Sequence, residues 1–247
     1  MTAAPESVTS RVLRVLESFA VTSPHLTLTE IARRSGLPLA TAHRLVGELT
    51  TWGALERGDD GRYRIGLRLW EVAALAPRSL GLREVAMPFL EDLYEATHEN
   101  VQLAVLDGLE VVYVERIFGR TAVGVRSRVG GRFPAHATGV GLVLLAYAPP
   151  DVQERYLAAP LATFTEKTIG DPALLRRTLA EVRRTGLAIS DRQVTLDALS
   201  VAAPVRDPGN TVIAALSLVV RADDSHPQAL AAAVVTAARG ISRALQR

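Results

Sequence analysis

Along residues 1–66, apolar positions recur every three or four residues and are interrupted by short polar turns. This spacing is typical of amphipathic helices that bury one face. It predicts three short helices, over residues 7–20, 28–35 and 38–52. We expect these helices to pack around one small core.

Local signals indicate where these helices begin and end. Thr27 and Glu30 have the T-x-x-E spacing of a capping box. Gly36 stands where a left-handed residue commonly ends a helix, and Pro38 suits the first turn of the next helix. The inward positions expected on that helix are Ala42, Leu45, Val46 and Leu49.

A hairpin is predicted after the third helix. Residues 54–57 and 62–65 have the length of short strands, and Asp60-Gly61 is a favourable turn between them. Successive side chains of a strand point to opposite faces. Tyr63 and Ile65 are therefore expected to point inward, and Arg62 and Arg64 outward.

The rest of the chain has an α+β pattern. Strands are predicted over residues 101–106, 110–117, 123–129, 187–190, 201–205 and 211–220. Helices are predicted over 82–97, from Thr138 to 147, from 172 to Gly186, and over 227–245. Pro88 is expected to bend or restart the first of them. Asp171-Pro172 is expected to cap the third.

The elements predict two domains joined by a helix. Residues 1–66 form the first domain, residues 67–82 a linker helix region, and residues 83–247 the second domain, an antiparallel sheet flanked by helices. The linker helix carries apolar side chains on one side. These are Leu67, Trp70, Ala74 and Leu75.

Composition and charge exclude several classes of protein. The chain has 247 residues, 48% of them hydrophobic and 22% charged, which excludes intrinsic disorder. It has no cysteine, which excludes a disulfide framework and any cysteine-ligated metal site. No apolar run is long enough for a membrane helix, so a cytoplasmic protein with no membrane contact is expected. The net charge is only +2, so any DNA contact must come from a local patch.

Residues 28–52, with a helix before them and a charged hairpin after, have the form of a winged helix-turn-helix. The second helix of such a motif enters the major groove and reads bases with its N-terminal residues. The expected DNA contacts are Arg33, Leu39, Ala40, Thr41, His43, Arg44, Arg62 and Arg64. The alternative is two helices of an ordinary bundle with a solvated charged face.

No residue pattern supports catalysis. The five histidines form no metal-binding spacing, and the sequence has no nucleophile elbow, Walker loop or dinucleotide fingerprint. His136, before a predicted helix, is expected to be a histidine satisfied by a backbone partner. We therefore expect no catalytic residue, no metal and no cofactor.

Several blocks of sequence, taken together, resemble one family. They are LTEIARRSGLPLATAHRL, WGALERGDDGRYRIGLRLWEV, ENVQLAVLDGLEVVYVER, VGGRFPAHATGVG, TIGDPALLRRTLAEVRRTGLAIS and SVAAPV. In this order they resemble the IclR family of bacterial transcription regulators over essentially the whole chain. The resemblance implies a winged helix-turn-helix domain, a linker helix and a C-terminal effector-binding domain related to GAF domains. It also implies a homodimer, or a dimer of dimers, on a palindromic operator in double-stranded DNA.

The segment Thr138-Gly139-Val140-Gly141 is the main candidate for the effector site. A helix N-terminus exposes backbone N–H groups and favours a carboxylate, and glycines let a ligand approach the backbone. With the resemblance, a small organic acid is the expected effector. The resemblance adds three polar groups to this pocket, Asp191, Ser200 and Ser217. A strand-to-helix turn that binds nothing is the alternative.

The sequence departs from the family pattern at both candidate sites. Leu39 and Ala40 stand where members often carry Arg and Ser, and His43 where an aromatic residue is common. Ser200 replaces a frequent Cys and Leu142 a common Lys, so a larger or more hydrophobic acid, such as an aromatic one, is our hypothesis for the effector. An architectural DNA-binding protein without an effector is the competing interpretation.

Overall fold

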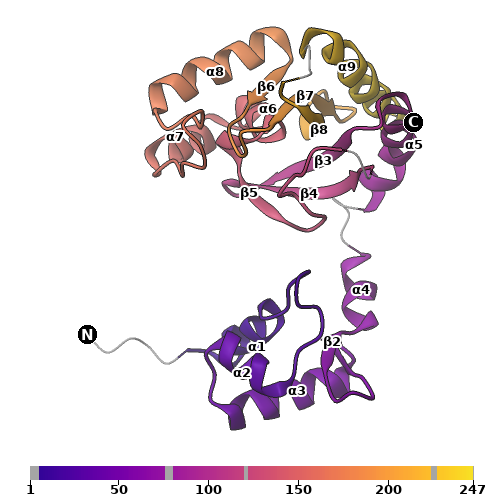
Figure 1. The fold of residues 1–247 in the computed structure, drawn as a ribbon, viewed down its shortest axis with the longest axis vertical. Helices are drawn as coiled ribbons and strands as arrows, with labels where there is room; N and C mark the ends of the chain where they lie inside the picture. The colour runs from indigo at the N-terminus through magenta and orange to yellow at the C-terminus, as the bar shows by residue number, and fades with distance from the viewer. Residues whose placement is uncertain (1–5, 76–79, 120–121, 224–226, 247) are drawn as a thin grey trace. The chain divides into compact units, whose positions relative to one another are not determined.

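The computed structural model describes residues 6–75, 80–119, 122–223 and 227–246. The chain divides into two compact units, residues 1–80 and 81–247, and each unit is described by itself (Figure 1). None of the helices in the described ranges is long and apolar enough to cross a membrane.

The first unit has four helices and one hairpin among its described residues. They are α1 (Val8–Glu17), α2 (Leu28–Ser35), α3 (Leu39–Trp52), β1 (Leu55–Arg57), β2 (Tyr63–Ile65) and α4 (Leu67–Ala73). Helices α1, α2 and α3 and the hairpin enclose one core, which includes Val15, Ile31, Leu45 and Leu55. The three helices and the hairpin predicted from the apolar pattern are therefore confirmed.

The helix boundaries follow the local signals. Thr27 and Glu30 form the predicted capping box: Thr27 Oγ1 accepts the Glu30 N–H at 3.3 Å, and a Glu30 carboxylate oxygen accepts the Thr27 N–H at 2.8 Å. Gly36 ends α2 with a φ of 63°. Pro38 lies just outside α3, at the N-cap position, so the helix begins one residue later than predicted.

The hairpin is shorter than predicted. Its two strands pair antiparallel, with Arg57 opposite Tyr63, and Tyr63 also pairs with Leu26 in the loop before α2. Tyr63 is buried as expected. Ile65 lies on the same face, opposite the buried Leu55, but it is 45% exposed. The strand ends at Ile65, which leaves part of that side chain open to solvent.

The second unit is an antiparallel sheet flanked by helices, which confirms the predicted α+β class. Six strands lie in the order β5-β4-β3-β8-β7-β6. The strands are β3 (Asn100–Asp107), β4 (Glu110–Ile117), β5 (Arg132–Pro134), β6 (Ala188–Asp191), β7 (Ala198–Arg206) and β8 (Val212–Arg221). The helices are α5 (Leu80–Thr97), a 3₁₀ turn η1 (Ala135–Ala137), α6 (Gly139–Tyr147), α7 (Pro150–Ala158), α8 (Pro172–Thr185) and α9 (Pro227–Ala244).

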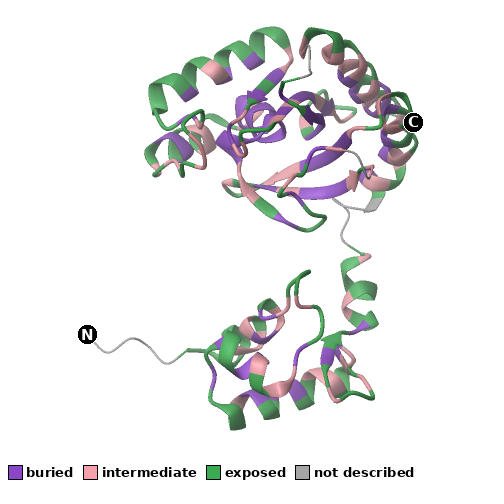
Figure 2. Ribbon diagram, viewed as in Figure 1, coloured by how far each residue is buried: buried purple, intermediate pink, exposed green. Residues whose placement is uncertain are grey.

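The two faces of this sheet bury different side chains. Val101 and Leu103 of β3 belong to the core under α5 and α9, whereas Ala104 belongs to the core under α6, α7 and α8. Helix α6 is the most enclosed of these helices, with every residue from Gly139 to Ala146 buried (Figure 2). Thr138 caps it as predicted, by accepting the Gly141 N–H at 3.1 Å.

The structure differs from the predictions for this unit at several elements. Residues 123–129 do not form a strand, because side chains of β3 and β4 bind their backbone groups instead of a neighbouring strand. The strand that does pair with β4 is β5, which lies further along the chain, and helix α7 was not predicted. Helix α5 continues through Pro88, which excludes a restart there and leaves the predicted bend as a prediction.

Candidate functional site

Helix α3 exposes the side that carries the predicted DNA-contacting residues. Leu39 is 53% exposed, Ala40, His43 and Arg44 are exposed, and Thr41 is half-buried. The opposite side buries Ala42, Leu45 and Val46 in the core. The structure thus brings these predicted DNA contacts together on one helix face.

The arginines of this surface are paired with carboxylates of the same chain. Arg44 contacts Glu48, one helical turn on, at 2.5 Å, and Arg64 contacts Glu56 across the hairpin at 2.8 Å. Arg62 contacts Glu30 at 3.4 Å. Exposed pairs of this kind are worth about 0–1 kcal/mol. A phosphate or a guanine can therefore replace the carboxylate at little cost.

The two arginines at the end of α2 differ in role. Arg33 is exposed, as a DNA contact must be. Arg34 instead donates to the Ser18 carbonyl oxygen at 3.1 Å and to Ser23 Oγ at 2.9 Å. Arg34 therefore holds the segment between α1 and α2 in place.

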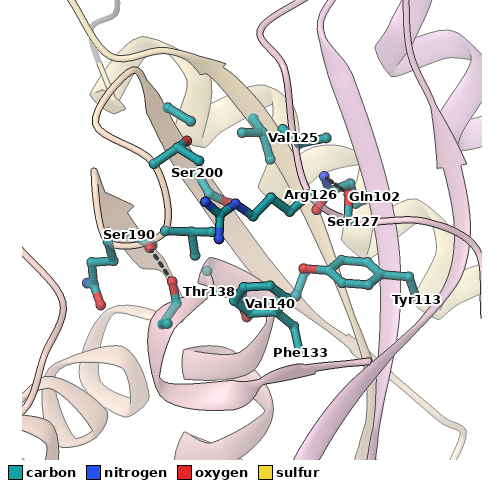
Figure 3. A pocket seen from close by; sticks show the side chains of 17 residues that line it. Gln102, Tyr113, Val125, Arg126, Ser127, Phe133, Thr138, Val140, Ser190 and Ser200 are labelled. Carbon is teal, nitrogen blue, oxygen red and sulfur yellow. Dashed lines mark hydrogen bonds between the residues drawn. The ribbon is translucent and has the colours of Figure 1, made fainter. Parts of the chain in front are cut away.

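A cavity in the second unit lies where the start of α6 faces the sheet. The cavity is open to solvent, and its empty space together with the solvent at its mouth is about 510 Å³. Strand side chains line it together with residues 125–127 (Figure 3) and residues 193–195. The lining residues are Gln102, Tyr113, Val125, Arg126, Ser127, Phe133, Ala137, Thr138, Gly139, Val140, Ser190, Gln193, Val194, Thr195, Ala198, Ser200 and Val219.

The pairing register of β6, β7 and β8 places three of the lining side chains on the same face of the sheet. Val219 of β8 lies opposite Ser200 of β7, and Ser200 lies opposite Ser190 of β6. These three side chains form a row on one face of the sheet, because directly paired residues point the same way. The row presents two hydroxyl groups beside apolar surface, which is the mixture found in small-molecule sites.

The segment 123–127 is fixed over the cavity by polar side chains of the neighbouring strands. Asn100 donates to the Val123 carbonyl oxygen at 2.9 Å, and Gln102 donates to Ser127 Oγ at 2.8 Å. Arg116 donates to the Ser127 carbonyl oxygen at 2.8 Å. These bonds hold the backbone of the segment although it is not part of the sheet.

The beginning of α6 lies close against β7. A side chain at Gly139 would place its Cβ 2.6 Å from Ser200 Oγ, so the Ser200 side chain would have to move to admit it. Thr138, Gly139, Val140 and Ser200 all line the cavity. Four of the seven predicted effector residues are thus brought together.

The other three predicted effector residues do not line the cavity. A Cβ at Gly141 would lie 2.5 Å from Ala135 Cα and even closer to its carbonyl oxygen, so this glycine serves the packing of α6 on η1. Asp191 is exposed and pairs with Arg192 at 2.9 Å. Ser217 is fully buried, opposite Gln102, one row further along the same sheet face.

Sequence reasoning missed the charged residue of the cavity. Arg126 is the one Lys, Arg, Asp or Glu among the described lining residues, and Figure 3 shows its side chain extending into the cavity toward Thr138 and Ser200. No local pattern indicated this role, because residues 123–129 were interpreted as a strand. Tyr113 and Phe133, two aromatic walls, were missed as well.

Two buried polar side chains support the cavity wall. Burial raises the pKa of Tyr113 to about 12, although a hydrogen bond with the Thr138 side chain lowers it. Its phenol therefore stays protonated at neutral pH. His136 is satisfied on both ring nitrogens, by the Tyr156 hydroxyl at 2.8 Å and the Ala162 carbonyl oxygen at 2.9 Å, and burial lowers its pKa. His136 is therefore a neutral structural residue.

The described residues include no group of three or more His, Cys, Asp or Glu side chains that could hold a metal ion.

The first unit presents a helix-turn-helix face, and the second unit has a cavity lined by a cation. Family models match both units: the IclR helix-turn-helix domain over residues 8–59, and the bacterial transcriptional regulator IclR C-terminal domain over residues 74–243. The chain belongs to the IclR family of bacterial transcriptional regulators. The predicted family is thereby confirmed.

Individual relatives agree with this assignment. This IclR-family regulator is 32% identical over 240 residues to the HTH-type transcriptional regulator XynR of Escherichia coli strain K12, and the match covers 95% of each chain. It is 41% identical to an IclR homologue from Microbacterium hydrocarbonoxydans solved in complex with 4-hydroxybenzoate. That match covers 97% of this chain and 99% of the other, with a TM-score of 0.92. The Thermotoga maritima IclR is 25% identical, with coverage of 97% and 98% and a TM-score of 0.79.

These matches bear on the class of protein. The curated relatives are DNA-binding regulators, and some are repressors by name, such as the transcriptional repressor IclR of Escherichia coli. Family membership confirms the interpretation that the chain is a transcriptional regulator rather than an enzyme.

Proposed function

We propose that this IclR-family regulator binds a palindromic operator as a dimer in the cytoplasm, and that a small organic acid in the cavity of the second unit controls that binding. Each subunit would place α3 in the major groove, and two-fold symmetry of the protein would match that of the operator. The exposed face of α3, with Arg44 at its centre, supports this docking.

The composition of the cavity lining carries the proposal of an acidic effector. The described lining residues include one cation and no carboxylate, and the N-terminus of α6 opens on the same space. Partial positive charge at a helix N-terminus favours an anion. An anionic ligand therefore meets attraction and no repulsion from these side chains.

The aromatic walls support an aromatic acid. Tyr113 and Phe133 line the cavity together with Val140 and Val219. A flat apolar ring can pack between such side chains, while hydroxyl groups at Ser200 and Thr195 can bind a polar substituent. The similar Microbacterium regulator was solved with 4-hydroxybenzoate, which makes that acid the first probe.

A thermal-shift screen with 4-hydroxybenzoate, benzoate and short aliphatic acids tests the effector proposal. An acid present at about 100 times its dissociation constant stabilises the folded state by about 2.7 kcal/mol. For a unit of this size, we expect a rise in melting temperature of about 5–10 °C. A panel in which every acid leaves the melting temperature unchanged would favour the architectural protein without an effector.

The mechanism that we propose is a shift between two states of the dimer. An effector changes the affinity for DNA only if it binds the two states with different affinities. The coupling is reciprocal, so operator DNA must change the affinity for the acid by the same factor.

The arginines of the hairpin are expected to contact phosphate rather than bases. We expect Arg64→Ala to weaken binding to all DNA sequences alike and to flatten the plot of log affinity against log salt by about 0.9 for each phosphate that the variant no longer neutralises. Arg62→Ala should act in the same direction, but Arg62 also pairs with the capping residue Glu30, so Arg64 is the cleaner test. The measurement is fluorescence anisotropy on specific and random duplexes at several salt concentrations.

Arg176→Ala is the matched control, since Arg176 is an exposed arginine of α8 paired with Glu154. It removes the same charge from the other unit and should leave the slope unchanged. Weakened binding to the specific duplex alone would show that the hairpin reads bases.

Helix α4 is expected to carry a dimer contact. Its described residues include no buried side chain, and Leu67 and Trp70 are 63% and 57% exposed (Figure 2). Apolar surface of this kind on a short helix is typical of an interaction site. Trp70→Glu should therefore weaken self-association and, with it, operator binding, as measured by light scattering and sedimentation. Glu71→Gln on the same helix is the control, and an unchanged oligomer for Trp70→Glu at low micromolar concentration would refute the contact.

A further inference from the structure

Arg126 is an exposed residue whose side chain also lines the cavity. Its segment is fixed to the sheet by Asn100, Gln102 and Arg116, so its backbone cannot easily carry it away. Arg126 lines the cavity, and Figure 3 shows its guanidinium group in the space between Ser200 and Thr138. The fold therefore holds a cation at the place where a ligand would lie.

This cation has no counter-ion in the part of the chain that the structure describes. Arg126 makes no ion pair there, whereas Arg44, Arg62, Arg64, Arg132, Arg176 and Arg192 all do. The two carboxylates nearest in sequence to the cavity lining are occupied elsewhere or exposed. Asp191 pairs with Arg192, and Asp197 is exposed. The missing partner of Arg126 can be supplied by a ligand.

A second cation lies behind the same wall. Arg116 is opposite Gln102 on β4 and donates to the Ser127 carbonyl oxygen and, at 3.1 Å, to Asn100 Oδ1. Both acceptors are neutral, and its Nε is buried without a partner among the described atoms. Burial lowers the pKa of Arg116. Its charge is not neutralised locally, so it adds to the positive potential of the cavity.

We propose that Arg126 selects the effector by its charge, binding the carboxylate of the acid through the two N–H groups of its guanidinium fork. This inference rests on the proposed function, because it takes the cavity to be the effector site. A guanidinium and a carboxylate fit each other in a bidentate pair that a neutral group cannot reproduce. The acid's carboxylate then lies at the guanidinium group, near Ser200 and Thr138, and its ring toward Tyr113 and Phe133.

The pairing also gives the segment 123–127 a part in regulation. A carboxylate bound to Arg126 joins this segment to the ligand, and the ligand contacts the start of α6 through Thr138 and Val140. Binding therefore connects the outer segment to a helix that is buried in the core. A neutral analogue of the same shape fills the cavity without making that connection.

The test compares an acid with its neutral amide. Calorimetric titration of the full-length protein with 4-hydroxybenzoate and with 4-hydroxybenzamide gives two affinities for each variant. We expect the wild type to prefer the acid by at least tenfold. Arg126→Gln should bind the acid about 10- to 100-fold more weakly than the wild type does, because it loses hydrogen bonds to a charged group. Its affinity for the amide should lie within about twofold of that of the wild type.

Two further variants give the matched controls. Arg126→Lys keeps the charge but loses the fork, so its affinity for the acid should lie between those of wild type and Arg126→Gln. Arg128→Gln removes an exposed arginine two residues away that does not line the cavity, and should bind both ligands as the wild type does. Circular dichroism should be the same for all four proteins.

The possible failures are distinguishable. If Arg126→Gln keeps the preference for the acid, or if the wild type binds acid and amide equally well, Arg126 is not the selecting group and the proposed regulation by a small molecule still stands. If the wild type binds neither these two ligands nor any acid of the thermal-shift panel, the proposed effector site itself fails, and the role of Arg126 fails with it.

Discussion

Replacing Gly141 by alanine is expected to lower the melting temperature of the second unit by about 6–12 °C. The added Cβ would lie 2.5 Å from Ala135 Cα and nearer still to the Ala135 carbonyl oxygen. Both are backbone atoms, so no side-chain rotation relieves the overlap, and α6 is buried on all sides. Overpacking of a core costs about 1–3 kcal/mol, and we expect the upper end here. Each kcal/mol of lost stability lowers the melting temperature of a unit of this size by roughly 2–4 °C, which gives the expected decrease.

Scanning calorimetry measures this effect in the full-length chain. The control is Gly81→Ala, because a Cβ at this α5 position meets no atom within 4 Å and the backbone there is not left-handed. Both tryptophans, Trp52 and Trp70, lie in the first unit, so their emission reports that unit separately. A Gly141→Ala protein that melts within about 2 °C of wild type would contradict the packing role and restore Gly141 as a position for ligand approach.

Arg44→Ala is expected to remove specific operator binding while leaving the fold intact. One bidentate contact between arginine and guanine is worth about 1–3 kcal/mol, and a symmetric dimer loses it twice. The expected decrease in affinity is therefore roughly 30-fold to 10⁴-fold. Removal of Arg44 also leaves Glu48 without its partner on the DNA-facing side of α3, which adds repulsion toward phosphate. Gel-shift titration on the operator measures the loss of specific binding, and titration on a random duplex measures the loss of binding to any sequence.

Arg44→Lys separates the two ways in which Arg44 can act. A lysine keeps the charge for a phosphate but cannot form the bidentate fork to guanine. If Arg44 reads a base, Arg44→Lys loses specificity almost as Arg44→Ala does. Unchanged operator affinity for Arg44→Ala, with a circular dichroism spectrum like that of wild type, would show that α3 does not dock through this residue.

Helix boundaries could be predicted from the sequence because they depend on neighbouring residues. The capping box at Thr27 and Glu30, the cap at Thr138 and the glycine ends at Gly36 and Gly186 are all present in the structure. Each requires only hydrogen bonds within a few residues, or a positive φ at one position. The three helices of the first unit followed from these signals together with the apolar spacing.

The cover of the cavity could not be predicted in the same way. Residues 123–129 have the valines typical of a strand, yet Asn100 and Arg116 bind their backbone from other parts of the chain. The real edge strand, Arg132–Pro134, is three residues long and ends in proline, which gives little strand signal. Arg126 became visible as a cavity residue only when the fold brought its segment over the start of α6.

The predicted effector residues show the same limit. Sequence reasoning correctly placed Thr138 at the start of a helix, and the helix start does line the cavity. The sequence alone does not show which glycine of the segment lies at the cavity and which packs against the backbone of a neighbouring turn. Gly139 lies at the cavity beside Ser200, and Gly141 packs on Ala135. The difference arises because positions two residues apart in a helix point about 160° away from each other.

Regulation by a small molecule requires that a ligand in the second unit change DNA binding by the first. The decisive experiment is fluorescence anisotropy with an operator duplex selected from random sequences, without ligand and at saturation with the acid that gives the largest thermal shift. Coupling between sites is commonly about 5- to 150-fold. We expect a change of at least fivefold in operator affinity, and an equal change in the affinity for the acid when the operator is bound. An operator affinity that stays the same at saturating acid would refute this coupling.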